Sequence, residues 1–65
     1  MANEESPREA AVRRIAEQET RVARQQKAVT ALEVHGVSTF AANRLLRTME
    51  ETLTALREGL RRYPA

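Results

Sequence analysis

Few residues of this 65-residue chain could carry out catalysis. The chain has one histidine, His35, one lysine, Lys27, and one tyrosine, Tyr63; its nine acidic residues are all glutamates, and it has no cysteine. Two-metal carboxylate bundles use inward-pointing Glu-x-x-His pairs, but the residue three positions before His35 is Leu32. Neither glycine belongs to a phosphate-binding loop. We therefore expect a protein that is not an enzyme and that holds no metal, cofactor or small molecule.

Basic side chains in the first half of the chain are the candidate contacts for nucleic acid: Arg13, Arg14, Arg21, Arg24 and Lys27. The sequence pI is near 9.9, but this value reflects the high pKa of arginine, and the formal net charge is only +2. Glu17 and Glu19 alternate with the basic residues, which weakens any focused field. Because no aromatic residue is interleaved for base stacking, nucleic acid is a disfavoured partner.

Helix signals predict where the first of two helices begins and ends. The segment Ser6–Glu9 combines an N-cap serine, a proline at the first helical position and a glutamate that can reach back to the cap. The first helix is expected over about 7–35, after a disordered tail at 1–5. Gly36 supplies the left-handed residue that commonly ends a helix, and Val37 can follow it in a Schellman motif.

The second helix is expected over about 39–63, after a turn at about 36–38. Ser38 is the preferred N-cap, with Thr39 as the alternative. The helix is expected to continue to the Tyr63-Pro64 boundary, since a residue before proline is pushed away from helical geometry.

So short a connection makes the two helices antiparallel neighbours within one domain, 1–65. In the second helix Leu46, Leu53 and Leu60 recur every seven residues, which is the spacing of a coiled-coil seam. The sequence therefore predicts an all-α, coiled-coil-like antiparallel hairpin. Its predicted core is Ile15, Val22, Val29, Leu32, Leu46, Met49, Leu53, Leu56 and Leu60.

A second uncharged stripe runs beside the leucine seam of the second helix. Its members are mostly small: Ala41, Leu45, Thr48, Thr52, Ala55 and Gly59. Small residues permit close contact between helices, and a chain this short buries only a small core. We therefore expect two copies to pair through this stripe as a homodimeric four-helix bundle.

Two glutamines interrupt the seam of the first helix at positions where apolar residues would stabilise more. Gln18 and Gln25 allow two interpretations. Buried amides can fix register or oligomeric state at a cost in stability; alternatively, both amides lie at the wet edge of the interface. Pairing the helices outward from the loop places Gln25 opposite Met49.

Apolar residues also gather near the turn: Val34, Val37 and Phe40. They could form an exposed tip that contacts a protein partner, or they could close the end of a bundle.

The expected compartment is the cytoplasm. The segment Met1–Ser6 is polar and acidic, whereas a signal peptide begins with a basic segment followed by an apolar one. No apolar run approaches the roughly 18 residues of a membrane span. The first helix also lacks the bulky apolar face of a membrane-surface helix.

Between Arg24 and Leu60 the chain carries the pattern Leu32-Glu33, Gly36, Thr39, Ala42, Leu45-Leu46, Met49-Glu50, Thr52-Leu53 and Arg57. In this pattern it resembles a loosely defined group of short bacterial helical-hairpin proteins of unknown function. The resemblance implies a helical hairpin in a bacterial cell and implies no activity and no site residues.

Two functional hypotheses follow from these patterns. The first is a non-enzymatic interaction or structural protein that self-associates through its second helix and binds a protein partner. The alternative is a small RNA- or DNA-binding four-helix bundle that uses the arginine face of its first helix.

Overall fold

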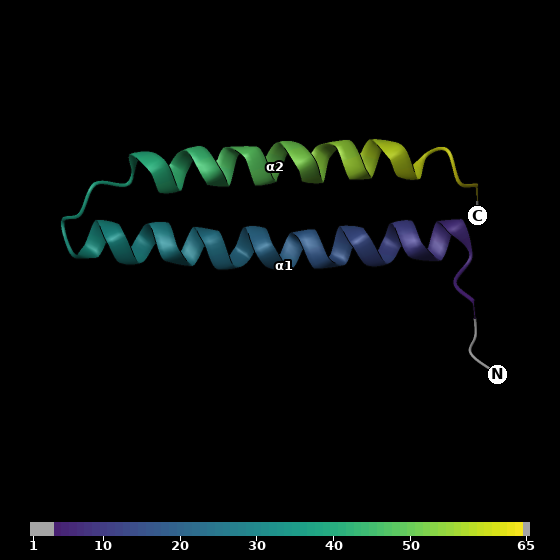
Figure 1. Cartoon of the computed structure of the whole chain (residues 1–65), viewed down its shortest axis with the longest axis horizontal. Helices are drawn as coiled ribbons and strands as arrows, with labels where there is room; N and C mark the ends of the chain where they lie inside the picture. Colours follow the sequence, from purple (N-terminus) through teal and green to yellow (C-terminus); the bar gives the residue numbers. More distant parts are fainter. Residues whose placement is uncertain (1–3, 65) are drawn as a thin grey trace.

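The computed structural model describes residues 4–64, which form two helices and no strand. Helix α1 spans Pro7–Val34 and helix α2 spans Phe40–Leu60, and the two lie side by side in opposite directions (Figure 1). The predicted all-α hairpin is confirmed. The predicted tail at 1–5 falls largely on residues 1–3, which lie outside the described part. The shortest dimension of the molecule, 14 Å, leaves room for one layer of helices.

Helix α1 begins with the predicted capping box. The backbone N–H of Glu9 donates to the Ser6 hydroxyl at 3.1 Å, and the Glu9 carboxylate accepts from the Ser6 backbone N–H at 3.0 Å. Pro7 occupies the first helical turn, where its missing N–H costs no hydrogen bond. The bonds from Ser6 favour the charged carboxylate and hold the pKa of Glu9 below its ordinary value of 4.5.

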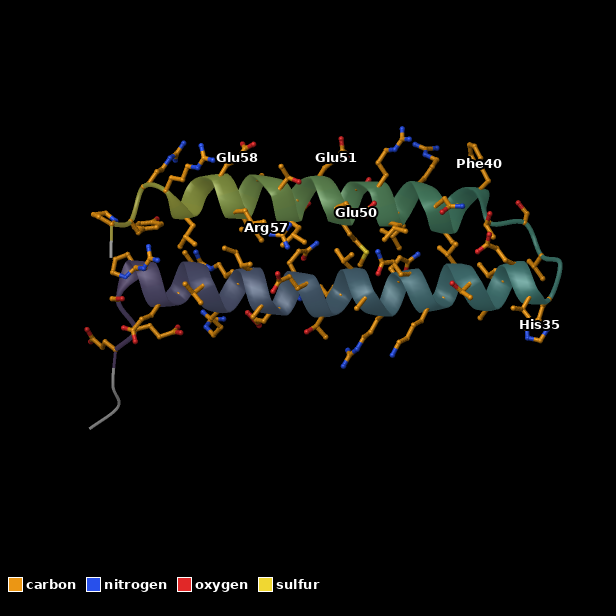
Figure 2. The ribbon with its side chains drawn as sticks, turned by 180° about the vertical axis from the view of Figure 1, so that it is seen from behind. His35, Phe40, Glu50, Glu51, Arg57 and Glu58 are labelled. Atoms are coloured by element: carbon orange, nitrogen blue, oxygen red, sulfur yellow. The ribbon has the colours of Figure 1, made fainter. Side chains whose placement is uncertain are left out.

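The turn after α1 is the Schellman motif that Gly36 predicts. Gly36 has a φ of +67°, its N–H donates to the Glu33 carbonyl at 3.1 Å, and the Val37 N–H donates to the Leu32 carbonyl at 3.0 Å. Helix α1 ends one residue earlier than predicted, because His35 is its C-cap. The backbone N–H of His35 donates to the Ala31 carbonyl at 3.2 Å, while its ring points away from the hairpin (Figure 2).

Helix α2 begins with Thr39 as its N-cap, so the alternative cap is right and the preferred Ser38 is wrong by one residue. The Thr39 carbonyl accepts the N–H of Asn43 at 2.8 Å. Its hydroxyl accepts the Asn43 side-chain amide at 3.0 Å rather than a backbone N–H. The Ser38 hydroxyl is 3.4 Å from the Phe40 nitrogen, a long bond that adds little.

Helix α2 ends at Leu60, three residues before the predicted boundary at Tyr63. Beyond it the chain tightens into bonds between residues three apart, and the Tyr63 N–H donates to the Leu60 carbonyl at 3.0 Å. Gly59 weakens the last turn of the helix. The Arg8 guanidinium also donates to the Tyr63 carbonyl, which ties the end of α2 to the start of α1.

The core is a single seam between the two helices. Val22, Val29 and Leu53 are buried. The other predicted core residues are half-buried: Ile15, Leu32, Leu46, Met49, Leu56 and Leu60. No side chain in the described part is fully enclosed, because each helix has a neighbour on one side only. Beside the seam, the Arg57 guanidinium and the Glu19 carboxylate pair across the helices at 3.0 Å.

The two glutamines of the seam donate to backbone carbonyls of α2. Gln18 is 7% exposed, and its side-chain amide donates to the Met49 carbonyl at 2.9 Å. The half-buried Gln25 donates to the Ala42 carbonyl at 3.0 Å. The wet-edge interpretation is therefore wrong for Gln18, whereas Gln25 stays half-buried and bonds α2 from there. The partner expected for Gln25, Met49, is instead the residue whose carbonyl Gln18 reaches.

A shift of seven residues on α1 thus matches a shift of seven residues on α2, so the two bonds repeat the same local geometry. Each acceptor oxygen has a second lone pair available beside its helical bond. Among residues 4–64, no buried side-chain nitrogen or oxygen lacks a hydrogen-bond partner. The glutamines therefore interrupt the apolar seam without leaving an unsatisfied amide.

Replacing Gln18 by glutamate should test this bond, since the change keeps the shape but substitutes an acceptor for the donor. At pH 7 a buried carboxylate would face the Met49 carbonyl, and we expect Gln18→Glu to lower the free energy of unfolding by about 2–3 kcal/mol. Burial raises the pKa of the new carboxyl, so the loss should shrink as the pH falls and the group is protonated. Thermal unfolding at pH 7 and pH 4 measures it.

The matched control for this change is Gln26→Glu, which alters an exposed glutamine of the same helix. It should change the free energy of unfolding by less than about 0.5 kcal/mol at either pH. Equal effects of the two variants would show that the Gln18 amide makes no bond to α2 in solution.

The capping box should make part of the stability depend on pH. The pKa of Glu9 is lowered in the folded chain. The stabilisation from its carboxylate is therefore complete at pH values above the ordinary pKa, and it is lost as the pH falls through the folded-state pKa. The variant Glu9→Gln should lose less stability than the unmodified chain over that acid range. Ser6→Ala should cost about 1 kcal/mol at pH 7. If thermal unfolding showed that the unmodified chain and Glu9→Gln lose the same stability as the pH falls, the capping role of Glu9 would be contradicted.

Candidate interaction surfaces

The uncharged stripe of α2 lies on the surface of the hairpin. Ala41, Leu45, Thr48, Thr52 and Ala55 are exposed, and Gly59 is half-buried. Leu45 is the large apolar member of this set and is 49% exposed. Since α1 covers the leucine seam, most of this uncharged stripe stays exposed beside it.

The threonine hydroxyls of this stripe are already hydrogen-bonded within α2. The Thr48 hydroxyl donates to the Arg44 carbonyl at 3.2 Å, and the Thr52 hydroxyl donates to the Thr48 carbonyl at 3.0 Å. Such bonds to the preceding helical turn satisfy the hydroxyl within the helix. A helix packed against the stripe would meet threonines whose donors are already used.

A small hollow continues the stripe toward the open end of the hairpin. It is lined by Ala11, Arg14, Ala55, Leu56, Gly59, Arg62 and Tyr63. A Cβ atom added at Gly59 would meet nothing within 4 Å, so the surface there is open. Both helices contribute to this hollow, which places Arg14 of α1 on the same face as the stripe of α2.

The apolar residues of the loop end are exposed in the hairpin. Val34 is 76% exposed, Phe40 is 71% exposed and Val37 is 53% exposed. Val34 is rotated by roughly 140° around α1 from the buried Val29, and Phe40 by a similar angle around α2 from the buried Leu53. Phe40 points away from α1 (Figure 2). All three apolar side chains are therefore exposed around the turn between the two helices.

A polar hollow lies beside Phe40 on the outer side of α2. Its lining is Ser38, Thr39, Phe40, Asn43, Arg44, Arg47 and Thr48. The Arg44 guanidinium carbon is 6.0 Å from the centre of the Phe40 ring, at the outer limit of a cation–π contact. The loop end thus combines one exposed aromatic ring with two arginines.

The candidate nucleic-acid face is partly neutralised by glutamates. The five basic residues are exposed: Arg13, Arg14, Arg21, Arg24 and Lys27. However, the Arg13 guanidinium lies 2.9 Å from the Glu5 carboxylate and 2.8 Å from the Glu17 carboxylate. These two carboxylates, Glu5 foremost, raise the pKa of Arg13. Arg13 pairs with Glu17 rather than with Glu9 because the capping box occupies Glu9.

The described residues offer no constellation for metal chemistry. Nowhere in the range 4–64 do three or more histidine or glutamate side chains come close enough to hold a metal ion. His35 stands alone at the loop end (Figure 2). Neither α1 nor α2 contains a stretch long and apolar enough to cross a membrane.

Comparison with known proteins adds no further constraint: no family model, curated protein or solved structure matches this chain. Its function has to be inferred from its own surfaces.

The charge arrangement predicts weak binding to nucleic acid. Counterion release scales with the number of phosphates neutralised, and Arg13 is already paired with two carboxylates. Fluorescence-anisotropy titrations with structured RNA and duplex DNA at about 0.15 M salt should show no saturable binding below roughly 10 μM. Submicromolar binding that weakens when Arg14, Arg21 and Arg24 become glutamine would instead establish the nucleic-acid alternative.

Proposed function

We propose that this chain is a non-enzymatic interaction protein whose working unit is a homodimer. Two hairpins pack α2 against α2 through the uncharged stripe and form a four-helix bundle. The observation that carries this proposal is the exposed stripe itself, which has one large apolar residue, small neighbours and internally bonded threonines. Its position on the surface leaves it free to contact a second copy.

The amount of exposed surface supports pairing. The chain exposes 5435 Å², whereas a compact monomer of 7.4 kDa exposes about 4,200 Å². This excess, about 1,200 Å², is larger than the about 800 Å² that each partner contributes to a standard interface. A second layer of helices would bring the surface of each chain close to that of a compact protein.

Within such a dimer, the loop ends and the outer sides of α1 stay available to a protein partner. Phe40 is the strongest candidate anchor there, since large aromatic side chains dominate binding energy at interfaces. Its exposed ring lies beside Arg44 and Arg47, so a partner surface with an apolar pocket bordered by carboxylates would fit it. A pull-down from lysate with the unmodified chain and Phe40→Ala, before and after nuclease treatment, separates a protein partner from nucleic acid.

A charge placed in the stripe should dissociate the dimer. Ala55→Arg would bury a guanidinium against an uncharged face of the second copy, at a cost of several kcal/mol, and should yield a monomer with lower helicity at micromolar concentration. Size-exclusion chromatography with light scattering measures the mass, and circular dichroism measures the helicity.

Thr54→Arg is the matched control, because Thr54 is also exposed and lies about 100° further around α2. It should leave the dimer intact. An unmodified chain that stays monomeric at millimolar concentration would refute self-association.

A further inference from the structure

We infer that the two α2 helices of the dimer run antiparallel, with the two-fold axis near Glu51, so that Arg44 of each chain pairs with the partner's Glu58. This inference rests on the proposed self-association and specifies its geometry. The charges along α2, the sizes of the stripe side chains and the arginines at the open end of the hairpin each favour the antiparallel arrangement.

Charged residues border the stripe in a line along α2. Arg44, Glu51 and Glu58 are spaced by seven residues, and each lies three residues after a stripe member, Ala41, Thr48 or Ala55. Residues three apart are neighbours on a helix surface. Glu51 and Glu58 point outward along the same edge of α2 (Figure 2). This border is basic near the loop and acidic toward the open end.

The order of these charges distinguishes the two possible symmetric pairings. In a parallel pair the borders of the two chains lie on opposite sides of the interface, so Arg44 has no partner glutamate of the border to pair with. In an antiparallel pair about Glu51, Arg44 meets the partner's Glu58 at two symmetric places. Like charges then meet at Glu51 alone, where Arg47 lies one helical turn away and offsets the repulsion. Flanking charges of this kind set the orientation of paired helices.

Side-chain size along the stripe follows the same asymmetry. Leu45, the large exposed member, lies in the half near the loop. Ala55 and Gly59 lie in the other half, and the space above Gly59 is open. An antiparallel pair places Leu45 against the partner's Ala55 and the partner's Gly59, whereas a parallel pair presses two Leu45 side chains together. Alternating large and small residues across a contact gives closer packing.

Positive charge at the open end of the hairpin also disfavours the parallel pair. Arg14 and Arg62 both line the hollow beside Gly59. Parallel packing would gather these two arginines from both chains at one end of the bundle. In the antiparallel pair the two Gly59 positions lie about 24 Å apart along the axis, and each hollow lies near the loop end of the partner.

Charge reversal tests the pairing directly. Arg44→Glu and Glu58→Arg, each alone, should raise the dimer dissociation constant about tenfold, since each turns two attractive contacts into repulsive ones. The double variant Arg44→Glu/Glu58→Arg should restore the original constant to within about threefold. A double variant as weak as the single ones would overturn the inference. Analytical ultracentrifugation measures all four chains.

Spin labels give an independent measurement of orientation, and the chain has no cysteine to interfere. A label on Phe40→Cys in the antiparallel dimer should lie about 33 Å along the axis from its symmetry mate, at a rise of 1.5 Å per residue. In a parallel dimer the two labels would be neighbours within about 20 Å. Arg61→Cys provides the second position, with about 30 Å expected along the axis.

The outcomes separate this inference from the proposal beneath it. A dimer with long distances at both positions supports the antiparallel arrangement. A dimer with short distances refutes the orientation and leaves self-association standing. A labelled chain that light scattering shows to be monomeric, together with a monomeric unmodified chain, refutes both.

Discussion

Two helices lying side by side can bury only the strip of each that faces the other, and this geometric limit determines the other properties of the hairpin. Val22, Val29 and Leu53 are buried along that strip, yet no described side chain is fully enclosed. The uncharged residues of α2 that do not fit on the strip lie at the surface. A second layer is therefore the natural way to cover them, and another copy of the same chain can supply it.

The ends of the hairpin show how local bonds compensate for so thin a core. At one end the Schellman bonds of Gly36 reverse the chain within a short turn and bring α2 back along α1. At the other end the Arg8 guanidinium bonds the Tyr63 carbonyl, and Arg57 pairs with Glu19 further along. The exposed ion pair contributes less than about 1 kcal/mol. These contacts hold the two helices in their antiparallel arrangement, while burial of apolar side chains along the seam supplies most of the stabilisation.

The sequence predicted the features that a few adjacent residues determine and missed those that depend on distant ones. The capping box of Ser6 and the left-handed Gly36 each follow from a short local pattern with a strong preference. Ser38 and Thr39 are both good N-caps, and the small difference between them was not enough to choose the right one. The bond from Arg8 to the Tyr63 carbonyl, just beyond the end of α2, joins residues 55 apart in the chain, and no local pattern predicts it. Helical periodicity located the surfaces. It could not predict that Glu5 neutralises Arg13, because the two residues are eight apart, outside the usual helical spacing.

The glutamine bonds have a consequence for how this hairpin can vary. Gln18 and Gln25 supply their donors from side chains, but the acceptors on α2 are backbone carbonyls, which every residue type carries. No substitution at Met49 or Ala42 other than one that breaks the helix removes an acceptor. The side-chain requirement of these two bonds thus falls on α1 alone. Homologues would keep the two glutamines without any covarying position on α2. Methods that find contacts through paired changes would overlook the most polar contact of the seam.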